Sequence, residues 1–363
     1  MKRFVCCVLV VLLLCPPVDA VDVPGISAKS AVLLDADSGR VLYSVNKDEP
    51  RLIASITKLM TALVALESGH KLDEVVSIQQ EWTGIEGSSL YLKPGEEIRL
   101  ETLLYGLLLR SGNDAAHAVA EYCAGGMDAF VHAMNKKAAD LGMMHTSFAN
   151  PSGLNAEDHF SSAYDMALLA RACLQNQTMR KMVSTRSITL ENRIFTNHNK
   201  LLWQYDGCIG LKTGYTEKAG RTLVSAAERD GMTLICVTLS DPNDWQDHAA
   251  LFDYGFANFK RHTLVRAGEL LCALPTPNSL VPLHKIRADR DCYAVLALGE
   301  EPIRQVTLLQ PSDSAYAAAG SVIGTVLFST SGMELCQMEL KLPYSISENT
   351  APERTGIFQL FGR

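Results

Sequence analysis

The chain has 363 residues, of which 47% are hydrophobic, and a formal net charge of −7 at pH 7. This length supports a substantial core and predicts two domains. The acidic balance, with no basic run to offset it, argues against nucleic acid as a partner. Beyond the N-terminal segment, no apolar run approaches the roughly 20 residues that a helix needs to cross a bilayer.

The first twenty residues have the three parts of a secretory signal peptide. Two basic residues precede an apolar run over residues 4–15, two prolines end that run, and small residues before position 21 suit a cleavage site. The run is too short to favour a retained membrane anchor. We therefore expect cleavage after Ala20, export, and an extracytoplasmic location.

Three of the ten cysteines lie in this N-terminal segment, which leaves seven in the mature chain. An odd number of widely separated cysteines without CxxC pairs favours neither a disulfide framework nor a zinc site. Cys236 lies in an apolar strand-like run and is expected to be a small core residue. The pattern therefore predicts mostly free, buried thiols.

The first elements in chain order form a hairpin. Residues 30–45 consist of two strand-like runs around the turn signal at residues 37–39. Helical patterns then dominate residues 54–183. Strands return near Gly207, and the run RTLVSAAERDGMTLICVTL carries a second hairpin signal, Asp-Gly, at residues 230–231.

The character of the sequence changes after one more amphipathic helix, which DWQDHAALFDYGFANF predicts. Residues 264–343 hold short β-rich runs broken by Gly, Pro and Ser, which is typical of a small all-β domain. We expect an α/β body, in which terminal strands pair around an inserted helical region, and then a β module. The predicted units are a signal peptide (1–20), the body (21–263), a β-rich domain (264–346) and a polar tail with a short apolar end (347–363).

The segment RLIASITKLMTALVALESGH, residues 51–70, has apolar residues on most sides of a helical wheel, as a helix buried all round does. Ser55 and Lys58 in its first turn are therefore unexpected, because lysine is rarely buried without a partner. Residues three apart share one helix face. A desolvated lysine has a lowered pKa and can deprotonate a serine, while the helix N-terminus favours the alkoxide. By itself, however, Ser-x-x-Lys arises by chance about once or twice in a chain of this length.

The segment LLLRSGNDAAHAVA places Ser111, Gly112 and Asn113 between two helical runs. Ser111 is a candidate to relay a proton, and Asn113 is a candidate to hold a substrate amide through its donor and its acceptor. The alternative is that one of these side chains only caps the following helix. Taken alone, the pattern favours the cap.

The segment GCIGLKTGYTEKAGRTLV places Lys212, Thr213 and Gly214 on a predicted strand. Lys212 supplies positive charge, Thr213 supplies a hydroxyl, and Gly214 lets a substrate backbone lie against an edge strand. The alternative is an exposed lysine beside a turn glycine, which suits any isolated Lys-Thr-Gly.

Together and in this order, the three motifs resemble those of the penicillin-interacting serine enzymes. The match extends to the low-molecular-mass D-alanyl-D-alanine carboxypeptidases over roughly residues 28–259. The segments that carry the resemblance are SITK, SGND, KTGYT, NPSGLN (150–155), AGRTLVSAAERDGM (219–232) and LFDYGF (251–256).

This resemblance implies a DD-peptidase/β-lactamase-like fold: a five-stranded antiparallel sheet flanked by helices, with an all-helical region on one side of the cleft. The implied activity is a serine D-Ala-D-Ala carboxypeptidase of peptidoglycan synthesis that contributes to cell shape. Ser55 would attack a peptidoglycan stem peptide with Lys58 as the base. Ser111 and Lys212 would pass the proton to the leaving D-alanine.

The resemblance further implies that the backbone amides of Ser55 and Tyr215 hold the oxyanion. Asn113, Lys212, Thr213, Gly214 and Tyr215 are the expected substrate-binding residues. β-Lactam antibiotics would acylate Ser55. No metal or cofactor is implied.

One feature of the family is missing. Many relatives carry an arginine just before the closing helix that binds the substrate's terminal carboxylate, and residues 241–256 contain none. Carboxylate binding then depends on Lys212 and Thr213, or on Arg221 or His248. The sequence does not decide among these residues.

Three other functions share parts of the pattern. A serine β-lactamase generally lacks an appended β domain and uses a separate glutamate for deacylation, a role that the resemblance does not give to Glu157. A non-catalytic binding protein would have lost a motif, and all three are intact. A general esterase remains an alternative, because motifs alone do not set substrate choice.

The last segment, GIFQLFGR, has apolar residues at helical spacing. A helix of about two turns is marginal in water, and ordering it costs about 1–2 kcal/mol per residue. We expect weak, salt-sensitive membrane contact rather than firm anchoring. The alternative is a tail that contacts nothing.

Overall fold

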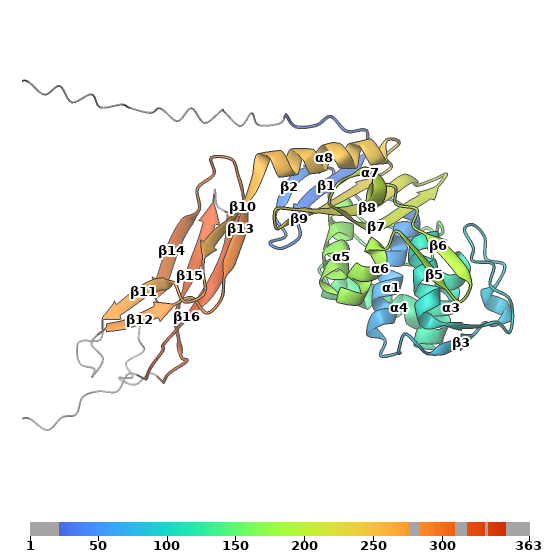
Figure 1. The fold of residues 1–363 in the computed structure, drawn as a ribbon, viewed down its shortest axis with the longest axis horizontal. Coiled ribbons are helices and arrows are strands. Elements are labelled where there is room, and N and C mark those ends of the chain that lie inside the picture. The colour runs from blue at the N-terminus through green and yellow to red at the C-terminus, as the bar shows by residue number, and fades with distance from the viewer. Residues whose placement is uncertain (1–21, 276–282, 309–317, 331–332, 346–363) are drawn as a thin grey trace, which may run out of the picture.

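The computed structural model describes residues 22–275, 283–308, 318–330 and 333–345 (Figure 1). The predicted signal peptide and the C-terminal tail both lie outside the described residues. Within the described ranges, no helix combines the length and the hydropathy that crossing a membrane requires.

The N-terminal body is built on a five-stranded antiparallel sheet with the strand order β2-β1-β9-β8-β7 (Figure 1). Both predicted hairpins are present, and β1 pairs with β9, so that Val32 lies opposite Val237. The prediction that terminal strands pair around an inserted region is therefore confirmed. The strands are β1 (Ser30–Asp35), β2 (Val41–Val45), β7 (Cys208–Thr216), β8 (Gly220–Arg229) and β9 (Met232–Leu239).

Both faces of this sheet are covered, because its central strands are apolar on both sides. Val32 and Val237 pack into the larger core with the helical region, including α5 (Ala163–Gln175). Leu33 and Cys236 point to the other face, which α8 (Asp244–Asn258) covers (Figure 1). Cys236 is fully buried, as predicted.

The inserted helical region follows β2. The predicted helices are present, and the helix that contains Lys58 is buried on most sides. Its elements are η1 (Ala54–Thr57), α1 (Lys58–Glu67), η2 (Gln80–Trp82), α2 (Leu100–Tyr105), the π-helical turn η3 (Gly106–Arg110), α3 (Asn113–Ala124), α4 (Met127–Asp140), α6 (Gln177–Ser184) and α7 (Leu201–Gln204).

Two small sheets within this region do not appear in the sequence prediction. β3 (Val75–Ser77) pairs with β4 (Glu97–Arg99), and β5 (Ser187–Leu190) pairs with β6 (Arg193–Thr196). Strands therefore return before Gly207, earlier than predicted. Three or four residues are too few for an alternating pattern to stand out.

The C-terminal part is a β module, as predicted. Its strands form one three-stranded sheet, β14-β15-β16, and the pairs β10-β13 and β11-β12 around a small apolar core. The predicted boundary between residues 263 and 264 falls inside β10, which follows α8 directly. The strands are β10 (Phe259–Val265), β11 (Leu270–Pro275), β12 (Leu283–Arg287), β13 (Cys292–Ala297), β14 (Ile303–Leu308), β15 (Val322–Thr330) and β16 (Met333–Lys341).

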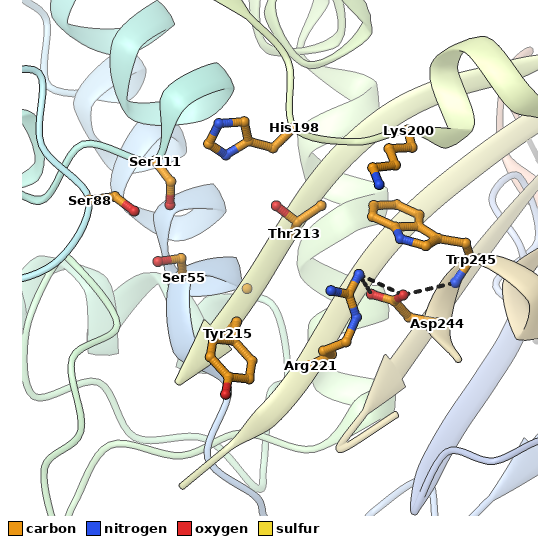
Figure 2. Close-up of a pocket in the computed structure, with 11 residues that line it drawn as sticks. Ser55, Ser88, Ser111, His198, Lys200, Thr213, Tyr215, Arg221, Asp244 and Trp245 are labelled. Atoms are coloured by element: carbon orange, nitrogen blue, oxygen red, sulfur yellow. Dashed lines mark hydrogen bonds and ion pairs between the residues drawn. The ribbon is translucent and has the colours of Figure 1, made fainter. Parts of the chain in front are cut away.

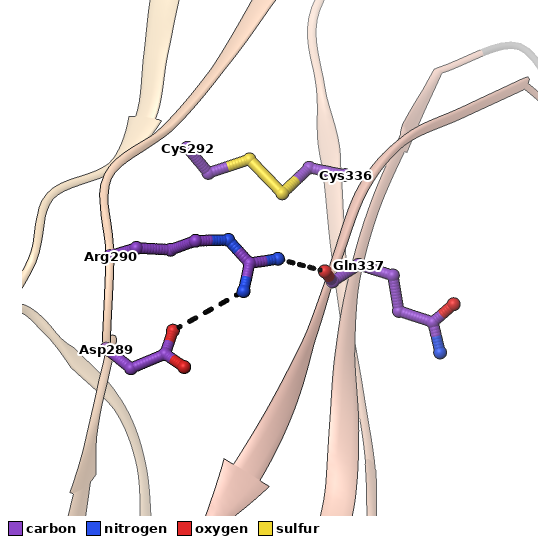
Figure 3. The surroundings of a disulfide bond; sticks show 5 residues. All are labelled: Asp289, Arg290, Cys292, Cys336 and Gln337. Carbon is purple, nitrogen blue, oxygen red and sulfur yellow. Dashed lines mark hydrogen bonds and ion pairs between the residues drawn. A yellow bond between two sulfur atoms is a disulfide. The ribbon is translucent and has the colours of Figure 1, made fainter. Parts of the chain in front are cut away.

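A disulfide joins Cys292 on β13 to Cys336 on β16 (Figure 3). Beside it, the Arg290 guanidinium donates to the Gln337 carbonyl oxygen at 3.0 Å. The prediction of mostly free thiols holds, since the other five cysteines among the described residues are free, but only two of those five are buried. The bonded pair could not be identified from spacing, because 44 residues separate its members and tertiary packing brings them together.

Arg40, in the turn before β2, connects the body to the β module. Its Nη1 lies 2.8 Å from Glu300 Oε2 and 2.7 Å from the Val295 carbonyl oxygen, and its guanidinium lies 5.8 Å from the centre of the Phe259 ring. The side chains of Arg40 and Glu300 are only 11% and 14% exposed. The two parts are thus joined by a shielded ion pair as well as by the chain.

Candidate active site

The buried lysine at the start of α1 has three polar partners. Lys58 Nζ donates to Ser55 Oγ at 2.9 Å, to Asn113 Oδ1 at 2.7 Å and to the Ser152 carbonyl oxygen at 2.5 Å. An ammonium nitrogen has three hydrogens, so these oxygens use its whole donor capacity, whereas a neutral amine donates two hydrogens and can accept from Ser55 Oγ. This explains how a lysine with no exposed surface is accommodated in an apolar helix.

Burial is the largest cause that holds the pKa of Lys58 well below its ordinary value of 10.5. The positive charge of Lys212 lowers this pKa further, while the carboxylate of Asp114 acts in the opposite direction. A lowered pKa favours the neutral amine, which can accept the proton of Ser55 Oγ. Ser55 and Lys58 therefore have the geometry and the electrostatics of a nucleophile and its base.

The π-helical turn η3 positions the second motif beside Ser55 and Lys58. Ser111 follows it in a left-handed conformation, with φ of 63°, and lies on the wall of the cleft. Asn113 begins α3, and its amide accepts from Lys58 and donates to the Glu86 carbonyl oxygen at 2.5 Å. The N-cap residue of α3 is Gly112, and the side chain that accepts from a first-turn amide is that of Asp114, from Ala115 N at 2.9 Å, rather than that of Ser111 or Asn113. The capping alternative is therefore wrong.

The third motif lies on β7, the edge strand next to η1. Lys212 is buried, so the alternative of an exposed lysine is also wrong. Burial lowers its pKa to about 7, and its Nζ donates to the Thr213 carbonyl oxygen at 2.8 Å. A Cβ on Gly214 would lie 2.4 Å from Thr222 Oγ1 and 2.9 Å from Ser55 N. Only glycine therefore lets β7 approach the serine this closely.

A cleft of about 400 Å³ opens between these elements (Figure 2). Ser55, Ser88 and Ser111 lie on one side of it, and Thr213 and Tyr215 of β7 lie on the other. Lys58, Asn113 and Lys212 are buried behind its surface. The remaining lining residues are His198, Lys200, Gly214, Arg221, Asp244 and Trp245.

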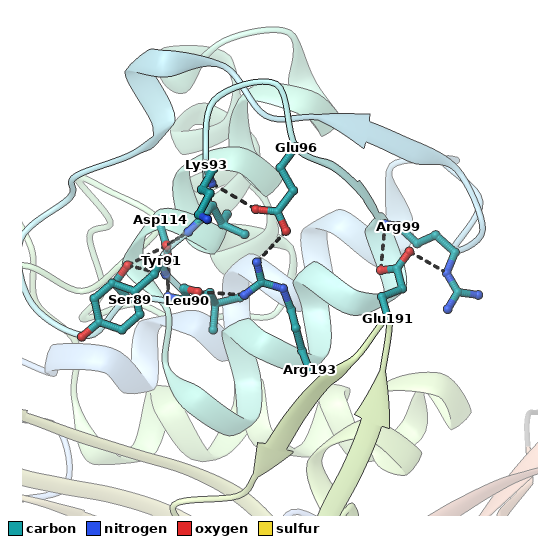
Figure 4. Close-up of polar contacts among 10 residues, drawn as sticks. Ser89, Leu90, Tyr91, Lys93, Glu96, Arg99, Asp114, Glu191 and Arg193 are labelled. Carbon is teal, nitrogen blue, oxygen red and sulfur yellow. Dashed lines mark hydrogen bonds and ion pairs between the residues drawn. The ribbon is translucent and has the colours of Figure 1, made fainter.

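The loop that contributes Ser88 is held by Asp114, the residue after Asn113 (Figure 4). The Asp114 carboxylate accepts from Ser89 Oγ at 2.6 Å and from the backbone amides of Leu90 and Leu92 at 2.9 and 3.1 Å. From the other side, Arg193 of β6 donates to the Leu90 carbonyl oxygen at 2.9 Å. Asp114 therefore positions this wall of the cleft rather than facing the cleft itself.

Sequence reasoning assigned no role to Ser152, whose carbonyl oxygen is a partner of Lys58. Asn150 Oδ1 shapes this turn by accepting from the amides of Ser152 and Gly153 at 3.2 and 2.8 Å. The available signal was the NPSGLN segment, because Asn, Pro, Ser and Gly together mark a turn. The sequence does not show in which direction the Ser152 carbonyl group points.

The two candidates for the missing arginine lie in different environments. Arg221 lines the cleft. His248 is fully buried in α8, where its Nδ1 lies 2.5 Å from Ser225 Oγ and its Nε2 lies 3.0 Å from Thr238 Oγ1. Burial lowers the pKa of His248 to about 3. A neutral, enclosed imidazole cannot bind a substrate carboxylate, so the structure removes His248 from the candidates.

No group of three or more His, Cys, Asp or Glu in the described ranges is arranged to hold a metal ion. The residues around the cleft support nucleophilic chemistry. Ser55 carries the activated hydroxyl and Lys58 the desolvated amine, while Ser111 adds a buried hydroxyl and Lys212 a buried lysine.

Comparisons with known proteins agree on one family. A family model described as D-alanyl-D-alanine carboxypeptidase, peptidase S11, matches residues 18–243. The chain is 32% identical over 324 residues to D-alanyl-D-alanine carboxypeptidase DacF of Bacillus subtilis (strain 168), covering 85% of this chain and 83% of that protein. It is 32% identical over 343 residues to DacA of Escherichia coli (strain K12), covering 90% and 85%.

The fold is similar to the crystal structure of penicillin binding protein 5 from Haemophilus influenzae. The TM-score is 0.79 at 30% sequence identity, and the match covers 90% of this chain and 100% of that one. The likeness therefore includes the β module as well as the body.

Proposed function

The chain belongs to the D-alanyl-D-alanine carboxypeptidase family, and we propose that it removes the terminal D-alanine of peptidoglycan stem peptides through an acyl-enzyme on Ser55. Family membership supports a penicillin-binding serine peptidase of this activity and does not favour the β-lactamase or esterase alternatives. The observation that carries the assignment of Ser55 is the 2.9 Å contact between its Oγ and the buried Lys58 Nζ.

In the first step, Lys58 takes the proton of Ser55 Oγ as this oxygen attacks the carbonyl carbon between the last two D-alanines. The hydrogen bonds from Lys58 to Asn113 and Ser152 hold the amine in place for this transfer. Since burial already disfavours the ammonium form, the new positive charge is readily passed on.

The proton then reaches the nitrogen of the departing D-alanine through Ser111, which lies across the cleft from Thr213 (Figure 2). Lys212 supports this transfer, because its pKa of about 7 lets it hold or release a proton near neutrality. Water then attacks the acyl-enzyme and releases the shortened peptide. A β-lactam acylates Ser55 by the same first step and is released slowly.

The backbone amides of Ser55 and Tyr215 form the oxyanion hole in this proposal. It is supported by the close approach of β7 to Ser55 N, which the missing side chain of Gly214 permits. Donors fixed in place before the reaction stabilise developing charge without reorganisation.

Glu157 is not positioned to act as the deacylating base that a β-lactamase reaction needs. It is exposed and lies outside the residues that line the cleft. Hydrolysis of the acyl-enzyme therefore depends on the residues around Ser55.

The substrate implies that the protein works outside the cytoplasm, where peptidoglycan is built and cell shape is set. We retain the division into body (21–263), β module (264–346) and tail (347–363) as part of the proposal. We also retain weak peripheral membrane contact through the tail, which liposome flotation with and without residues 352–363 tests. Equal flotation of both forms would show that the tail is not an anchor.

The decisive experiment identifies the nucleophile by covalent labelling. Labelled penicillin should attach to Ser55, and the protein should release D-alanine from a diacyl pentapeptide faster than it hydrolyses a penicillin or a simple ester. Ser55→Ala should abolish labelling and release. Ser68→Ala, at the other end of α1, is the matched control and should leave both unchanged. Labelling that persists in Ser55→Ala would overturn the assignment.

A further inference from the structure

The cleft continues past the reacting residues to a fixed arginine. From Ser55 it extends across the edge strand β7, past Thr213, to Arg221 of β8 and Trp245 of α8 (Figure 2). A peptide that acylates Ser55 with its leaving D-alanine toward this end would bring its terminal carboxylate toward Arg221.

Two residues of the first turn of α8 hold the Arg221 guanidinium. Its Nη2 donates to both carboxylate oxygens of Asp244 at 2.8 Å, and its Cζ lies 5.3 Å from the centre of the Trp245 ring. The Asp244 side chain is only 2% exposed, whereas that of Arg221 is 39% exposed. One edge of the guanidinium is thus anchored, and the other is open to the cleft.

The open edge keeps unused hydrogen-bond capacity. Among the residues that the structure describes, Nε and Nη1 of Arg221 have no hydrogen-bond partner. A guanidinium presents its donors in a planar fork that matches a carboxylate. Because Asp244 and Trp245 already restrict the side chain, binding an anion here costs little further conformational entropy.

The other cations near the cleft suit this role less well. Lys212 is buried and donates to the Thr213 carbonyl oxygen. Lys200 lines the same end of the cleft, but it is exposed and would lose rotamer freedom on binding. Of the arginine and lysine residues that line the cleft in the described part of the chain, Arg221 is the one that combines a fixed position with free donors.

We propose that Arg221 binds the terminal carboxylate of the substrate and makes the enzyme specific for a free C-terminus, with Asp244 and Trp245 as positioning residues. This assignment rests on the proposed function, since it concerns the same cleft. It also accounts for the missing arginine before α8: the guanidinium comes from β8, and α8 supplies the residues that hold it.

The test compares a diacyl peptide ending in D-Ala-D-Ala with its C-terminal amide. In Arg221→Gln, kcat/KM for the free acid should fall about 10- to 100-fold, the range for losing a hydrogen bond to a charged group. The value for the amide should not change. Arg229→Gln is the matched control, because Arg229 is also on β8 and stacks 4.7 Å from the Phe256 ring, outside the cleft.

Asp244→Asn tests the positioning role. It should raise KM for the acid with little change in kcat, and it should add nothing further in a double variant with Arg221→Gln, because both changes remove the same interaction. Arg221→Lys should recover only part of the preference, since an ammonium cannot form the planar fork.

Two outcomes would overturn the proposal: an Arg221→Gln variant that keeps the wild-type preference for the acid, or one that loses acid and amide turnover equally. Either result counts against Arg221 only if the wild-type protein releases D-alanine and is labelled by penicillin on Ser55. A wild-type protein that does neither would instead contradict the proposed function.

Discussion

Lys58 and Lys212 are among the largest side chains that the fold buries completely. Burial disfavours the charged form of each, so the same desolvation that costs stability also lowers the pKa of both amines, that of Lys212 to about 7. Lys58 and Lys212 are therefore examples of function maintained at the expense of stability.

At Lys58, replacement by Met keeps most of the side-chain volume and removes the base. We expect D-alanine release and penicillin acylation to fall by at least about a hundredfold, which is the low end for loss of a general base. Circular dichroism should remain that of the wild type, because no cavity is created. Lys137→Met, at an exposed ion pair with Glu67, is the control. Acylation at the wild-type rate in Lys58→Met would contradict its role as the base.

Lys212 should leave a signature in the pH dependence of stability. Its pKa is about 7 when folded and about 10.4 when unfolded. Between these values the unfolded chain binds a proton that the folded chain does not, so the free energy of unfolding rises with pH, by at most about 1.4 kcal/mol per pH unit. Lys212→Met removes this contribution.

Denaturant titrations from pH 6 to pH 10 should therefore show Lys212→Met more stable than the wild type near pH 7, with the difference shrinking as pH rises. Loss of the Lys212 charge also raises the pKa of Lys58 toward its ordinary value, which stabilises Lys212→Met in the same direction. Parallel stability curves would show that Lys212 is not a buried amine of lowered pKa.

At the scale of elements, the site depends on three segments that approach one another closely. The turn before α1 is contacted by the loop of residues 150–155 on one side and by β7 on the other. A Cβ on Gly153 would lie 2.0 Å from the Ala54 carbonyl oxygen, and one on Gly214 would lie 2.9 Å from Ser55 N. At Gly153 a positive φ of 85° adds to this requirement.

Gly214→Ala should force β7 away from η1. Overpacking of this kind costs about 1–3 kcal/mol of stability, and a displacement of about 1 Å lowers turnover by about a hundredfold. Penicillin acylation rates and thermal unfolding measure the two effects. Gly25→Ala is the control, because nothing lies within 4 Å of its added Cβ. If Gly214→Ala acylates as fast as the wild type, close approach of β7 is not required.

At the scale of the whole molecule, the cleft belongs to the body alone, while the β module has its own core and its own disulfide. The shielded Arg40–Glu300 pair sets how the two parts meet. The chemistry at Ser55 should therefore tolerate loosening of the β module.

Reduction of the Cys292–Cys336 bond should destabilise the β module by about 2–4 kcal/mol, the typical value for a native disulfide. Penicillin acylation of Ser55 should be unchanged. Thermal unfolding with and without a reductant reports the first effect, and labelling reports the second. Cys272→Ser, at a free cysteine of the same module, is the control. A loss of acylation on reduction would show that the module shapes the cleft.

Much of this molecule followed from the sequence by itself. Turn signals between strand-like runs, Asp-Ser-Gly at residues 37–39 and Asp-Gly at residues 230–231, predicted both hairpins. Helical spacing predicted α2 to α5 and α8, and the short β-rich runs predicted a separate module. The serine and lysine of the first motif sit one helical turn apart, so local geometry alone brings them together. These features depend on residues near one another in the chain, and short-range rules describe them well.

Tertiary structure decided the rest. Asn113, Ser152 and Lys58 meet only because α3, a loop and α1 pack together. The type of a residue does not show that its backbone carbonyl, as at Ser152, accepts a hydrogen bond. Arg221 and His248 were equal candidates in the sequence, and they differ because one faces the cleft and the other is enclosed between Ser225 and Thr238. Burial and direction are properties of packing between distant segments, which composition and spacing do not contain.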